Sequence, residues 1–519
     1  MQAYKILWAD DEIDLLRPHI LFLENKGYEI TPVNSGSDAV DFCDEDNFDL
    51  VFLDENMPGM TGLEALNIIK GKYPSLPVVM ITKSEEESIM EEAIGSKISD
   101  YLIKPLNPNQ ILLSVKKILD NKRLVTEHAN IHYQQDFASI SMAIGDNLSH
   151  EEWVDIYKRI IYWELELDRS GSQGMAEILE NQKIEANSHF AKFIQNNYED
   201  WLSDEDEDRP LLSHELMREK VFPVLDKGTS VFFIVIDNLR FDQWKILQSD
   251  IEEFFNVEDE DSYYSILPTT TAYSRNAIFS GLMPSEMERK YPDYWVGEDV
   301  DEGKNNHEHD FLEKQLQDEG LDIKWTYNKI KQVNQGKNFV ESISSLMQNE
   351  LNVAVFNFVD MLSHSRTDMA MIRELAPDES AYRSLTRSWF KHSTLLEALK
   401  KISLKGGKLI ITTDHGMVRV KKPYKIIGDK NTNTNLRYKQ GKNLGYDPSD
   451  VYVCKDPAKL FLPRLNVSSS YVFALKDRFF AYPNNYNYYV KYYRDTFQHG
   501  GVSLEEMIIP VISLNSRNG

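Results

Sequence analysis

Three apolar stretches in the second half of the chain each lead into side chains that bind metal ions. KLIITTDHG ends in Asp414 and His415, VFFIVIDN carries Asp237, and NVAVFNFVDMLSH carries Asp360 with His364 four residues later. A short continuous apolar run predicts a strand that is buried on both faces, as in a parallel sheet. Because ligands bind beyond the carboxyl ends of such strands, we expect these groups to gather at one edge and form a metal site.

A threonine-rich segment supplies a candidate nucleophile for this site. SILPTTTAYSRNAIFSGLMPSE predicts a short strand, three threonines and a helix that ends at Gly281. Thr271 falls where that helix begins, so its hydroxyl would lie near free backbone N–H groups that favour an anion. A threonine hydroxyl needs a base or a metal to remove its proton at neutral pH. A metal held by Asp237, Asp414 and His415 would do this.

A second cation would complete the site. Asp360 and His364 need a distant partner, and His499 in FQHGGVSLEEMIIP is the candidate because two glycines beside it let the backbone approach a ligand. Aspartate and imidazole ligands without thiolate suit Zn²⁺ best and Mn²⁺ next. Two such ions about 4 Å apart can hold the attacking and leaving oxygens of an in-line phosphoryl displacement.

The first part of the chain also brings polar side chains to predicted strand ends. Five strand patterns alternate with helix patterns, which predicts a doubly wound parallel (βα)5 sheet. The side chains at these strand ends are Asp10, Asp11, Asp54, Thr82 and Lys104. Clustered carboxylates suit a hard cation such as Mg²⁺, which serves phosphoryl chemistry. Asp54 is then a candidate acceptor of a phosphoryl group, with Lys104 as its counter-charge.

The chain of 519 residues is too long for one core, and its patterns divide it into three segments. We expect the α/β sheet domain over 1–121, a three-helix bundle over 122–205 and an α/β domain over 206–519. The acidic stretch SDEDEDRP marks the second boundary. The bundle is either a packed spacer or a transmitter that moves when Asp54 is phosphorylated.

Charge and composition exclude several classes of protein. Lys and Arg number 57 against 83 Asp and Glu, a net charge of −26, which argues against a general nucleic-acid or membrane binder. Two cysteines without CxxC spacing exclude a disulfide framework and a cysteine metal cluster. The N-terminal sequence lacks the pattern of a signal peptide, and no apolar run reaches about 18 residues. We therefore expect a cytoplasmic protein.

The front segment resembles the receiver domain of bacterial response regulators. The resemblance rests on the acidic pair Asp10 and Asp11, Asp54 within DENMPGMTG, the switch pair Thr82 and Tyr101, and Lys104 before Pro105. It implies phosphorylation of Asp54 by a sensor histidine kinase and dimerisation of the receiver. It also implies Mg²⁺ held by Asp10 or Asp11, by Asp54 and by the carbonyl of Asn56. Lys83 follows Thr82 where a small residue is commoner, which leaves the choice of partner open.

The back segment, from about 232 to 510, resembles alkaline-phosphatase-superfamily domains of the PglZ type. VIDN, LPTTTAYSR, FVDMLSH, TTDHG and HGGVSLEEMIIP occur in the order of that superfamily. The resemblance makes Thr271 the nucleophile at the metals. The residues that it assigns to one metal are Asp237, Asp414 and His415, and those that it assigns to the other are Asp360, His364 and His499. A sulfatase is disfavoured, because it would need a modifiable Cys or Ser at position 271. Joined to a receiver, the whole chain is similar to PorX-type response regulators, which implies control of type IX secretion in Bacteroidota and a sigma factor as a partner.

The loop 419–443 suggests the class of substrate. It holds eight Lys or Arg against one acid, Asp429, and would draw an anion despite the overall field. Aromatic residues among cations suit base stacking with phosphate contact, unless these lysines only keep a loop soluble. The candidate substrate-binding residues are Lys421, Lys422, Tyr424, Arg437 and Tyr438.

Two functions remain open. The first is a zinc-dependent phosphodiesterase acting on nucleotides or on cyclic or linear oligonucleotides, activated by phosphorylation of Asp54 and by homodimerisation. The second is a docking module for a sigma factor or another signalling partner, in which the metals are structural. Direct promoter binding is disfavoured, because no helix-turn-helix pattern follows the receiver and the chain is acidic.

Overall fold

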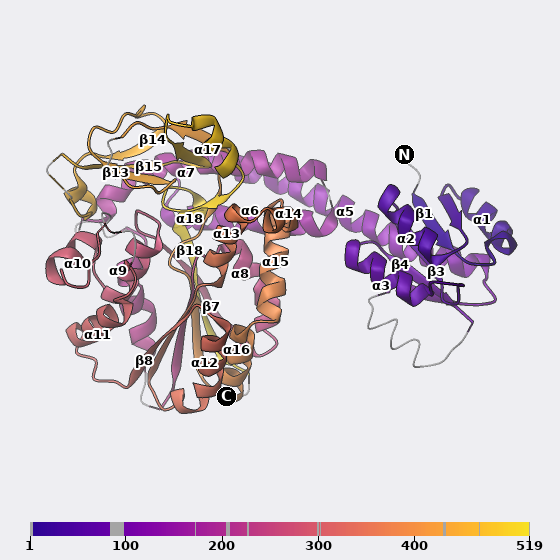
Figure 1. The fold of residues 1–519 in the computed structure, drawn as a ribbon, viewed down its shortest axis with the longest axis horizontal. Coiled ribbons are helices and arrows are strands. Elements are labelled where there is room, and N and C mark those ends of the chain that lie inside the picture. The colour runs from indigo at the N-terminus through magenta and orange to yellow at the C-terminus, as the bar shows by residue number, and fades with distance from the viewer. Residues whose placement is uncertain are drawn as a thin grey trace. The chain divides into compact units, whose positions relative to one another are not determined.

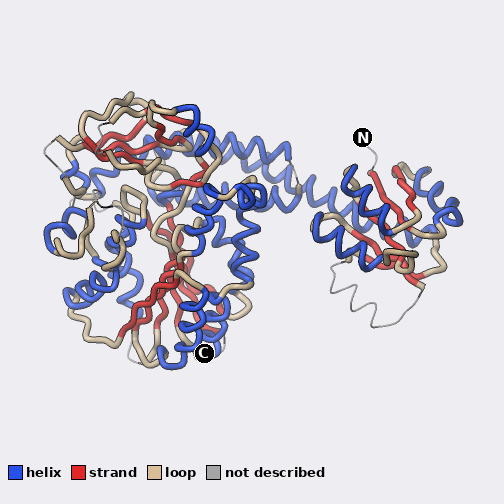
Figure 2. Tube along the Cα trace, viewed as in Figure 1, coloured by secondary structure: helices blue, strands red, loops and turns tan. Residues whose placement is uncertain are grey.

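The computed structural model describes residues 4–83, 98–171, 173–203, 208–225, 228–297, 300, 303–428, 432–464, 466 and 468–517. The chain forms two compact units. One comprises Met1–Gln134 with Ser170–Ser172, and the other comprises Gln135–Arg169 with Gln173–Gly519. Figure 2 shows that each unit contains a group of strands with helices around it. No helix in the described ranges is long and apolar enough to cross a membrane.

The first unit is a parallel five-stranded sheet in the order β2-β1-β3-β4-β5. The strands are β1 (Lys5–Ala9), β2 (Glu29–Val33), β3 (Leu50–Asp54), β4 (Val78–Thr82) and β5 (Asp100–Ile103), and the helices between them include α1 (Arg17–Glu24), α2 (Gly36–Glu45) and α3 (Gly62–Lys72). Every residue of β3 and β4 is buried, as a central strand covered on both faces requires. The predicted doubly wound parallel sheet is confirmed, whereas the helix expected from Glu85 lies outside the described residues.

Three long helices follow: α5 (Pro108–Ile144), α6 (His150–Ser170) and α7 (Gln173–Trp201). The sequence predicts a last helix of the front domain and then a separate first helix of the bundle. The structure instead has one helix of 37 residues, because no Gly or Pro interrupts the chain before Gly145. The predicted capping box begins α6, where Ser149 Oγ accepts from the Glu152 N–H at 3.2 Å and Glu152 accepts from the Ser149 N–H at 2.8 Å. Almost all of α6 and α7 belongs to the second unit.

The second unit is built on a mixed six-stranded sheet in the order β7-β18-β10-β6-β9-β8. The strands are β6 (Val231–Ile236), β7 (Phe255–Tyr264), β8 (Trp325–Ile330), β9 (Leu351–Phe356), β10 (Lys408–Thr412) and β18 (Ile508–Ser516). β10, β6, β9 and β8 are parallel, and β18 and β7 add antiparallel pairs. The apolar runs that predict buried strands form β6, β9 and β10 at the centre of this sheet.

Helices flank this sheet on both sides in Figure 1. One group comprises α9 (Asn276–Ser280), α10 (Pro284–Lys290) and α11 (Glu308–Asp318), and the other comprises α8 (Phe241–Ile251), α12 (Val333–Leu346), α15 (Glu379–Lys391) and α16 (Thr394–Leu404). Two shorter helices, α13 (Phe358–Asp368) and α14 (Ala370–Leu375), follow β9. The predicted α/β class is therefore correct for this unit as well.

Small sheets occupy the chain between β10 and β18. β13 (Tyr438–Gly441), β15 (Ser470–Ala474) and β14 (Val451–Cys454) pair in that order. β12 (Lys422–Lys425) pairs with β16 (Arg478–Ala481), and β11 (Val418–Arg419) pairs with β17 (Phe497–Gln498). Two short helices, α17 (Tyr486–Tyr493) and α18 (Leu504–Met507), complete the segment. Three of these strands come from 419–443 or adjoin it, so this stretch is not the single loop that its composition suggests.

Candidate functional site

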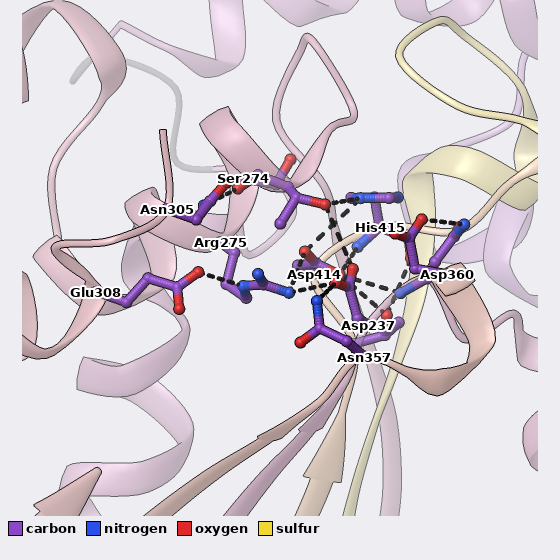
Figure 3. A network of polar contacts seen from close by, with 12 residues as sticks. Asp237, Ser274, Arg275, Asn305, Glu308, Asn357, Asp360, Asp414 and His415 are labelled. Carbon is purple, nitrogen blue, oxygen red and sulfur yellow. Dashed lines mark hydrogen bonds and ion pairs between the residues drawn. The ribbon is translucent and has the colours of Figure 1, made fainter. Parts of the chain in front are cut away.

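The carboxyl ends of two adjacent parallel strands place one group of metal-binding side chains. Asp237 directly follows β6, and Asp414 and His415 follow β10, which pairs with β6 in register from Lys408 and Val231 onward. One ligand atom from each of these three residues lies within 4.8 Å of the other two. All three side chains are buried. The sequence-predicted residues of the first metal site therefore converge, as Figure 3 shows around Asp237, Asp414 and His415.

A second group of three side chains comes from a helix and a turn. Asp360 and His364 lie one turn apart on α13, and His499 directly follows β17. Their ligand atoms also lie within 4.8 Å of one another. Asp360 Oδ1 is 3.5 Å from His364 Nε2 and 3.8 Å from His499 Nε2. The expectation that Asp360 sits at a strand end is wrong, because β9 ends at Phe356 and α13 has begun by Phe358.

The two groups adjoin each other, and the candidate nucleophile lies beside the first. The rings of His415 and His499 stack with their centroids 4.2 Å apart. Thr271 Oγ1 is 3.1 Å from His415 Nε2 and 3.4 Å from Asp237 Oδ1. Thr271 opens a helical turn that runs to Arg275 and continues into α9, which Gly281 ends in a left-handed conformation. The structure thus brings Thr271 to the ligands as the sequence predicts.

Arg275 is a functional candidate that sequence reasoning missed. Its Nη1 lies 2.7 Å from Asp237 Oδ2 and 3.6 Å from Asp414 Oδ2, and its Nε donates to Glu308 at 2.6 Å. Figure 3 shows this guanidinium between Glu308 and the two aspartates. It follows Thr271 by four residues, so helical periodicity could have placed it on the same face. Arg275 offsets part of the negative charge that these carboxylates would otherwise carry into a buried site.

Two asparagines hold the ligands in place. Asn357 Nδ2 donates to Asp237 Oδ2 at 2.9 Å, and Asn238 Nδ2 donates to Asp360 Oδ1 at 3.2 Å. Asn238 directly follows Asp237 after β6, and Asn357 directly follows Phe356, the last residue of β9. A position just after a buried strand is therefore the sequence signal that could have identified both asparagines. Amide donors to a ligating carboxylate fix its orientation, as outer partners do in metal sites. These contacts give both groups of ligands a fixed geometry.

The electrostatics and the donor set fit metal ions. Burial raises the pKa of Asp237; Arg275 opposes that change, while Asp414 and Asp360 add to it. Burial and the neighbouring His415 lower the pKa of His499, which favours the neutral imidazole that binds metals. The buried Oδ2 atom of Asp414 has no hydrogen-bond partner among the described residues. Three carboxylates and three imidazoles in two adjoining groups form a donor set that suits Zn²⁺.

A cavity of about 520 Å³ opens beside both groups. Its lining includes Asp237, Thr271, Asp360, His364 and His499 from the metal-binding side. The rest of the lining that bears on substrate is Lys304, Asn305, Lys329, Lys331, Asn435 and Tyr438. Volumes of this order accommodate ligands of the size of a nucleotide.

Of the five predicted substrate-binding residues, only Tyr438 lines this cavity within the described structure. Arg437 is fully buried and pairs with Glu506, Lys421 pairs with Glu180, and Lys422 lies 3.6 Å from Asp477. The Tyr424 hydroxyl accepts from the backbone N–H of Asp447 at 2.5 Å. The structure therefore places Lys421, Lys422, Tyr424 and Arg437 outside the described lining of this cavity, each with a partner elsewhere in the fold.

The first unit holds a separate acidic site at the ends of β1 and β3. Asp10 and Asp54 are buried, Asp11 is exposed, and one oxygen from each lies within 4.8 Å of the others. Lys104 Nζ lies 2.6 Å from Asp54 Oδ1 and 2.9 Å from Asp10 Oδ2. Burial raises the pKa of Asp54, although its hydrogen bond with Lys104 opposes the change. An all-oxygen donor set of this kind suits Mg²⁺.

The switch residues lie near this site in the same sheet. Thr82 ends β4 and its hydroxyl donates to Glu55. Tyr101, on β5, is 39% exposed. The N–H of Asn56 donates to Asp54 Oδ2 at 3.2 Å, which brings the Asn56 backbone close to the acceptor carboxylate. The structure thus places Asp10, Asp54, Thr82 and Lys104 at the carboxyl edge of one parallel sheet, whereas Tyr101 lies within β5 opposite Met80.

Comparison with known protein families finds three matches along the chain. Residues 216–514 match the BREX system PglZ alkaline phosphatase-like domain, residues 123–202 match the PorX response regulator linker domain, and residues 6–116 match the response regulator receiver domain. Together the three matches reproduce the architecture of PorX-type response regulators.

Two curated proteins are each similar to part of the chain. The transcriptional regulatory protein ResD of Bacillus subtilis is 35% identical over 115 residues, which is 22% of this chain and 48% of that protein. The transcriptional regulatory protein SrrA of Staphylococcus aureus is 27% identical over 151 residues, or 29% of this chain and 62% of that protein. The chain thus spans about half to three-fifths of the length of these relatives. Among solved structures, Vibrio cholerae CheY4 is 27% identical, with a TM-score of 0.22, and the match covers 22% of this chain and 98% of CheY4.

Proposed function

Because the chain belongs to the PglZ alkaline-phosphatase-like family, we propose that its second unit is a zinc-dependent phosphodiesterase that acts on nucleotides or on cyclic or linear oligonucleotides. The observation that carries this proposal is the position of Thr271. Its hydroxyl lies 3.1 Å from His415 Nε2, at the junction of two adjoining groups of metal-binding side chains. A lone structural metal would have no need of a second group or of a hydroxyl aimed at the first.

The proposed metals would supply charge and Lewis acidity. Two Zn²⁺ ions, with Mn²⁺ as the second choice, would be held by Asp237, Asp414 and His415 and by Asp360, His364 and His499, and would polarise the phosphoryl oxygens and lower the pKa of the Thr271 hydroxyl. The protein fixes the imidazole of His415 through Nδ1, which lies 3.0 Å from the Gly416 carbonyl oxygen. With Nδ1 donating to that carbonyl, Nε2 presents its lone pair towards the site.

The residues of the chain then perform the transfer in two steps. Thr271 Oγ attacks phosphorus, the bond from phosphorus to the first alcohol breaks, and a diester of threonine forms. The hydroxyl proton has an acceptor in the Asp237 carboxylate, whose Oδ1 lies 3.4 Å from Thr271 Oγ1. A water in the cavity gives a proton to the departing alcohol oxygen, the hydroxide that remains attacks the same phosphorus, and Asp237 returns its proton to the Thr271 oxygen as the bond from phosphorus to Thr271 breaks. Arg275 holds Asp237 in place throughout.

The receiver is the proposed switch. A sensor histidine kinase would phosphorylate Asp54 with Mg²⁺ held by Asp10, Asp11, Asp54 and the carbonyl of Asn56, and the phosphorylated protein would form a homodimer with an active phosphodiesterase. The receiver match and the pairing of Asp54 with Lys104 support this part of the proposal. By its PorX-type architecture, the protein is proposed to regulate type IX secretion and to meet a sigma factor.

Hydrolysis of bis-p-nitrophenyl phosphate by the zinc-loaded protein tests the proposed chemistry. Thr271→Val keeps the size of the side chain but removes the nucleophile, so we expect turnover to fall by at least about a thousandfold. Thr271→Ser keeps a hydroxyl and should retain measurable turnover. Equal product release by the wild type and Thr271→Val would show that the nucleophile is wrongly assigned.

Exposed apolar side chains favour the second candidate function, a docking module with structural metals. Met361, Met369, Met371 and Leu375, on and between α13 and α14, are 47–70% exposed. They adjoin His364, which is itself exposed, on the same short stretch of chain. Such a surface suits a protein partner. An Asp360→Ala protein that binds less zinc but keeps full signalling output would favour docking over catalysis.

A further inference from the structure

We propose that the cavity binds a second phosphoryl group of the substrate, next to the one that is cleaved, and that Lys331 is the residue that contacts it. This inference rests on the proposed phosphodiesterase function and narrows its substrate to molecules with at least two phosphates. Lys331 would then determine specificity without taking part in bond cleavage.

The charges in the cavity lining are divided between two sides. Asp237 and Asp360 lie with the imidazoles on the metal-binding side. The lysines of the lining are Lys304, Lys329 and Lys331, from the segment 303–306 and the carboxyl end of β8. The protein has a net charge of −26, so three lysines in the lining of one cavity give this place a local positive charge that the chain as a whole lacks. A positive side beside a two-metal site attracts an anion that extends beyond the scissile group.

The segments that carry the cavity lysines are hydrogen-bonded to the segment that carries Thr271. Asn305 Nδ2 donates to the Thr271 carbonyl at 2.9 Å, and Asn276 Nδ2 donates to the Lys304 carbonyl at 2.9 Å. Lys329 Nζ donates to the Asn305 carbonyl at 2.7 Å. The spacing between the lysines and the nucleophile is therefore fixed by hydrogen bonds rather than by a free loop.

Lys329 already has an ion-pair partner, whereas Lys331 has none among the described residues. Lys329 Nζ lies 2.7 Å from Glu308, the same carboxylate that pairs with Arg275. Burial lowers the pKa of Lys329, Glu308 opposes this, and the charges of Arg275 and Lys331 lower it further. Lys331 is exposed, and among the described residues no carboxylate lies within ion-pair distance of it. Its ammonium thus adds an uncompensated positive charge close to Lys329.

The rest of the lining adds polar contacts rather than a stacking surface. Asn435 offers an amide to the cavity, and Tyr438 lines it with only 3% of its surface exposed. The rings of Tyr438 and Tyr273 make an edge contact at 6.0 Å, so Tyr438 is held by its neighbours. A substrate with one phosphate and a small neutral leaving group would leave Lys331 unused.

Matched substrates separate recognition of the second phosphate from cleavage. Adenylyl-adenosine (ApA) carries one phosphate, pApA adds a terminal phosphate, and ApApA adds an internal diester. We expect the wild type to have a higher kcat/KM for pApA or ApApA than for ApA. The better of these two substrates shows whether the site recognises a terminal phosphate or an internal diester. Lys331→Gln should raise the KM for that substrate about tenfold, the size of one charge-assisted contact, and should change the KM for bis-p-nitrophenyl phosphate, which has no second phosphate, by less than about twofold. Lys331→Arg should restore most of the preference, and Lys337→Gln, an exposed lysine on α12, serves as the control.

A binding measurement keeps the inference testable if turnover is absent. The zinc-loaded Thr271→Val protein should bind adenosine 3′,5′-bisphosphate about tenfold more tightly than adenosine 5′-monophosphate by calorimetry, and Lys331→Gln should abolish the difference. Equal loss for all substrates, or no change in Lys331→Gln, would overturn the inference. No turnover of any diester by the wild type, together with a Lys331-dependent preference for the bisphosphate, would overturn the proposed catalysis and leave the second-phosphate site standing.

Discussion

Arg437→Met is expected to destabilise the second unit rather than to weaken substrate binding. Arg437 was a candidate for substrate contact by sequence, but its Nε lies 3.1 Å and its Nη2 lies 2.5 Å from the two carboxylate oxygens of Glu506. Both side chains are fully buried. The guanidinium therefore neutralises an internal carboxylate and has no surface to offer a ligand.

The size of the effect follows from what Glu506 keeps when Arg437 is removed. Breaking a buried pair by removing one partner usually costs about 3–5 kcal/mol. Glu506 would still accept hydrogen bonds from the Gly501 N–H at 2.9 Å and the Ser503 hydroxyl at 2.8 Å. We therefore expect Arg437→Met to lower the free energy of unfolding by about 3 kcal/mol, the lower end of that range. Arg437→Met with Glu506→Gln removes both charges but keeps an acceptor for Gly501, and should recover about 2 kcal/mol of that loss.

Activity should fall with stability, because the pair supports a proposed metal ligand, His499. Gly501 follows His499 by two residues, and its N–H is held by Glu506. Without Arg437, Glu506 keeps this hydrogen bond but loses the ion pair that fixes its own position. We expect the kcat for bis-p-nitrophenyl phosphate to fall about tenfold or more with its KM changed less than twofold, since Arg437 does not line the cavity among the described residues.

Urea unfolding and steady-state kinetics on the same samples test this reasoning. Lys422→Met is the matched control: Lys422 was predicted to bind substrate too, but its ammonium is exposed and lies 3.6 Å from Asp477, so the change should alter the free energy of unfolding by less than about 1 kcal/mol. If Arg437→Met unfolded at the same urea concentration as the wild type but had a raised KM, the structural role would be refuted. Arg437 would then be assigned to substrate binding.

Three further predictions concern a buried lysine, a linker contact and the metals. Burial lowers the pKa of Lys439 to about 7, so between pH 7 and 10 the unfolded chain binds a proton that the folded chain lacks, and the free energy of unfolding rises with pH. Lys439→Met should be more stable than the wild type by roughly 2–4 kcal/mol at pH 7 and by little at pH 10, and an advantage independent of pH in urea unfolding would contradict this. Asn187 accepts from the Leu504 N–H at 2.9 Å and donates to Glu505 at 3.1 Å, so Asn187→Leu should cost about 1–3 kcal/mol and lower kcat, whereas Asn197→Leu on the same helix should cost less than about 1 kcal/mol. Metal analysis should find two zinc ions per wild-type chain and about one in Asp360→Ala; at 100 times its dissociation constant, zinc should stabilise the second unit by about 2.7 kcal/mol, and unchanged thermal unfolding after chelation would rule out a bound metal.

The metal-binding side chains could be located from the sequence because parallel strands impose a common edge. Asp237 and Asp414 each follow a short apolar run, and strands of one parallel sheet end on the same side. Asp360 and His364 could also be found, since spacing by four residues places two side chains on one face of a helix. His499 could be suggested only by the two glycines beside it and by resemblance, because no periodicity and no long apolar run marks it in the sequence.

The substrate side could not be located in the same way, because local charge says nothing about distant partners. Lys421 pairs with Glu180, which is 241 positions away, and Arg437 pairs with Glu506, which is 69 positions away. A count of cations within 419–443 does not reveal either carboxylate, because both lie outside this stretch of sequence. Two of the three lysines in the cavity lining, Lys329 and Lys331, belong to WTYNKI and the residue after it, and the polar composition of this stretch does not predict an edge strand such as β8.

The helical linker also reaches the candidate site, since α7 contacts both the segment that carries Thr271 and the segment that carries His499. The Tyr198 hydroxyl accepts from the Leu267 N–H at 2.8 Å, four residues before Thr271. Asn187 holds the N–H of Leu504, five residues after His499. These groups are buried, so a shift of α7 would leave polar atoms unpaired on both sides of the active site at once. Because α7 is bonded to both segments, the linker is the part of the second unit through which phosphorylation of Asp54 is expected to change turnover, and a passive spacer would need neither contact.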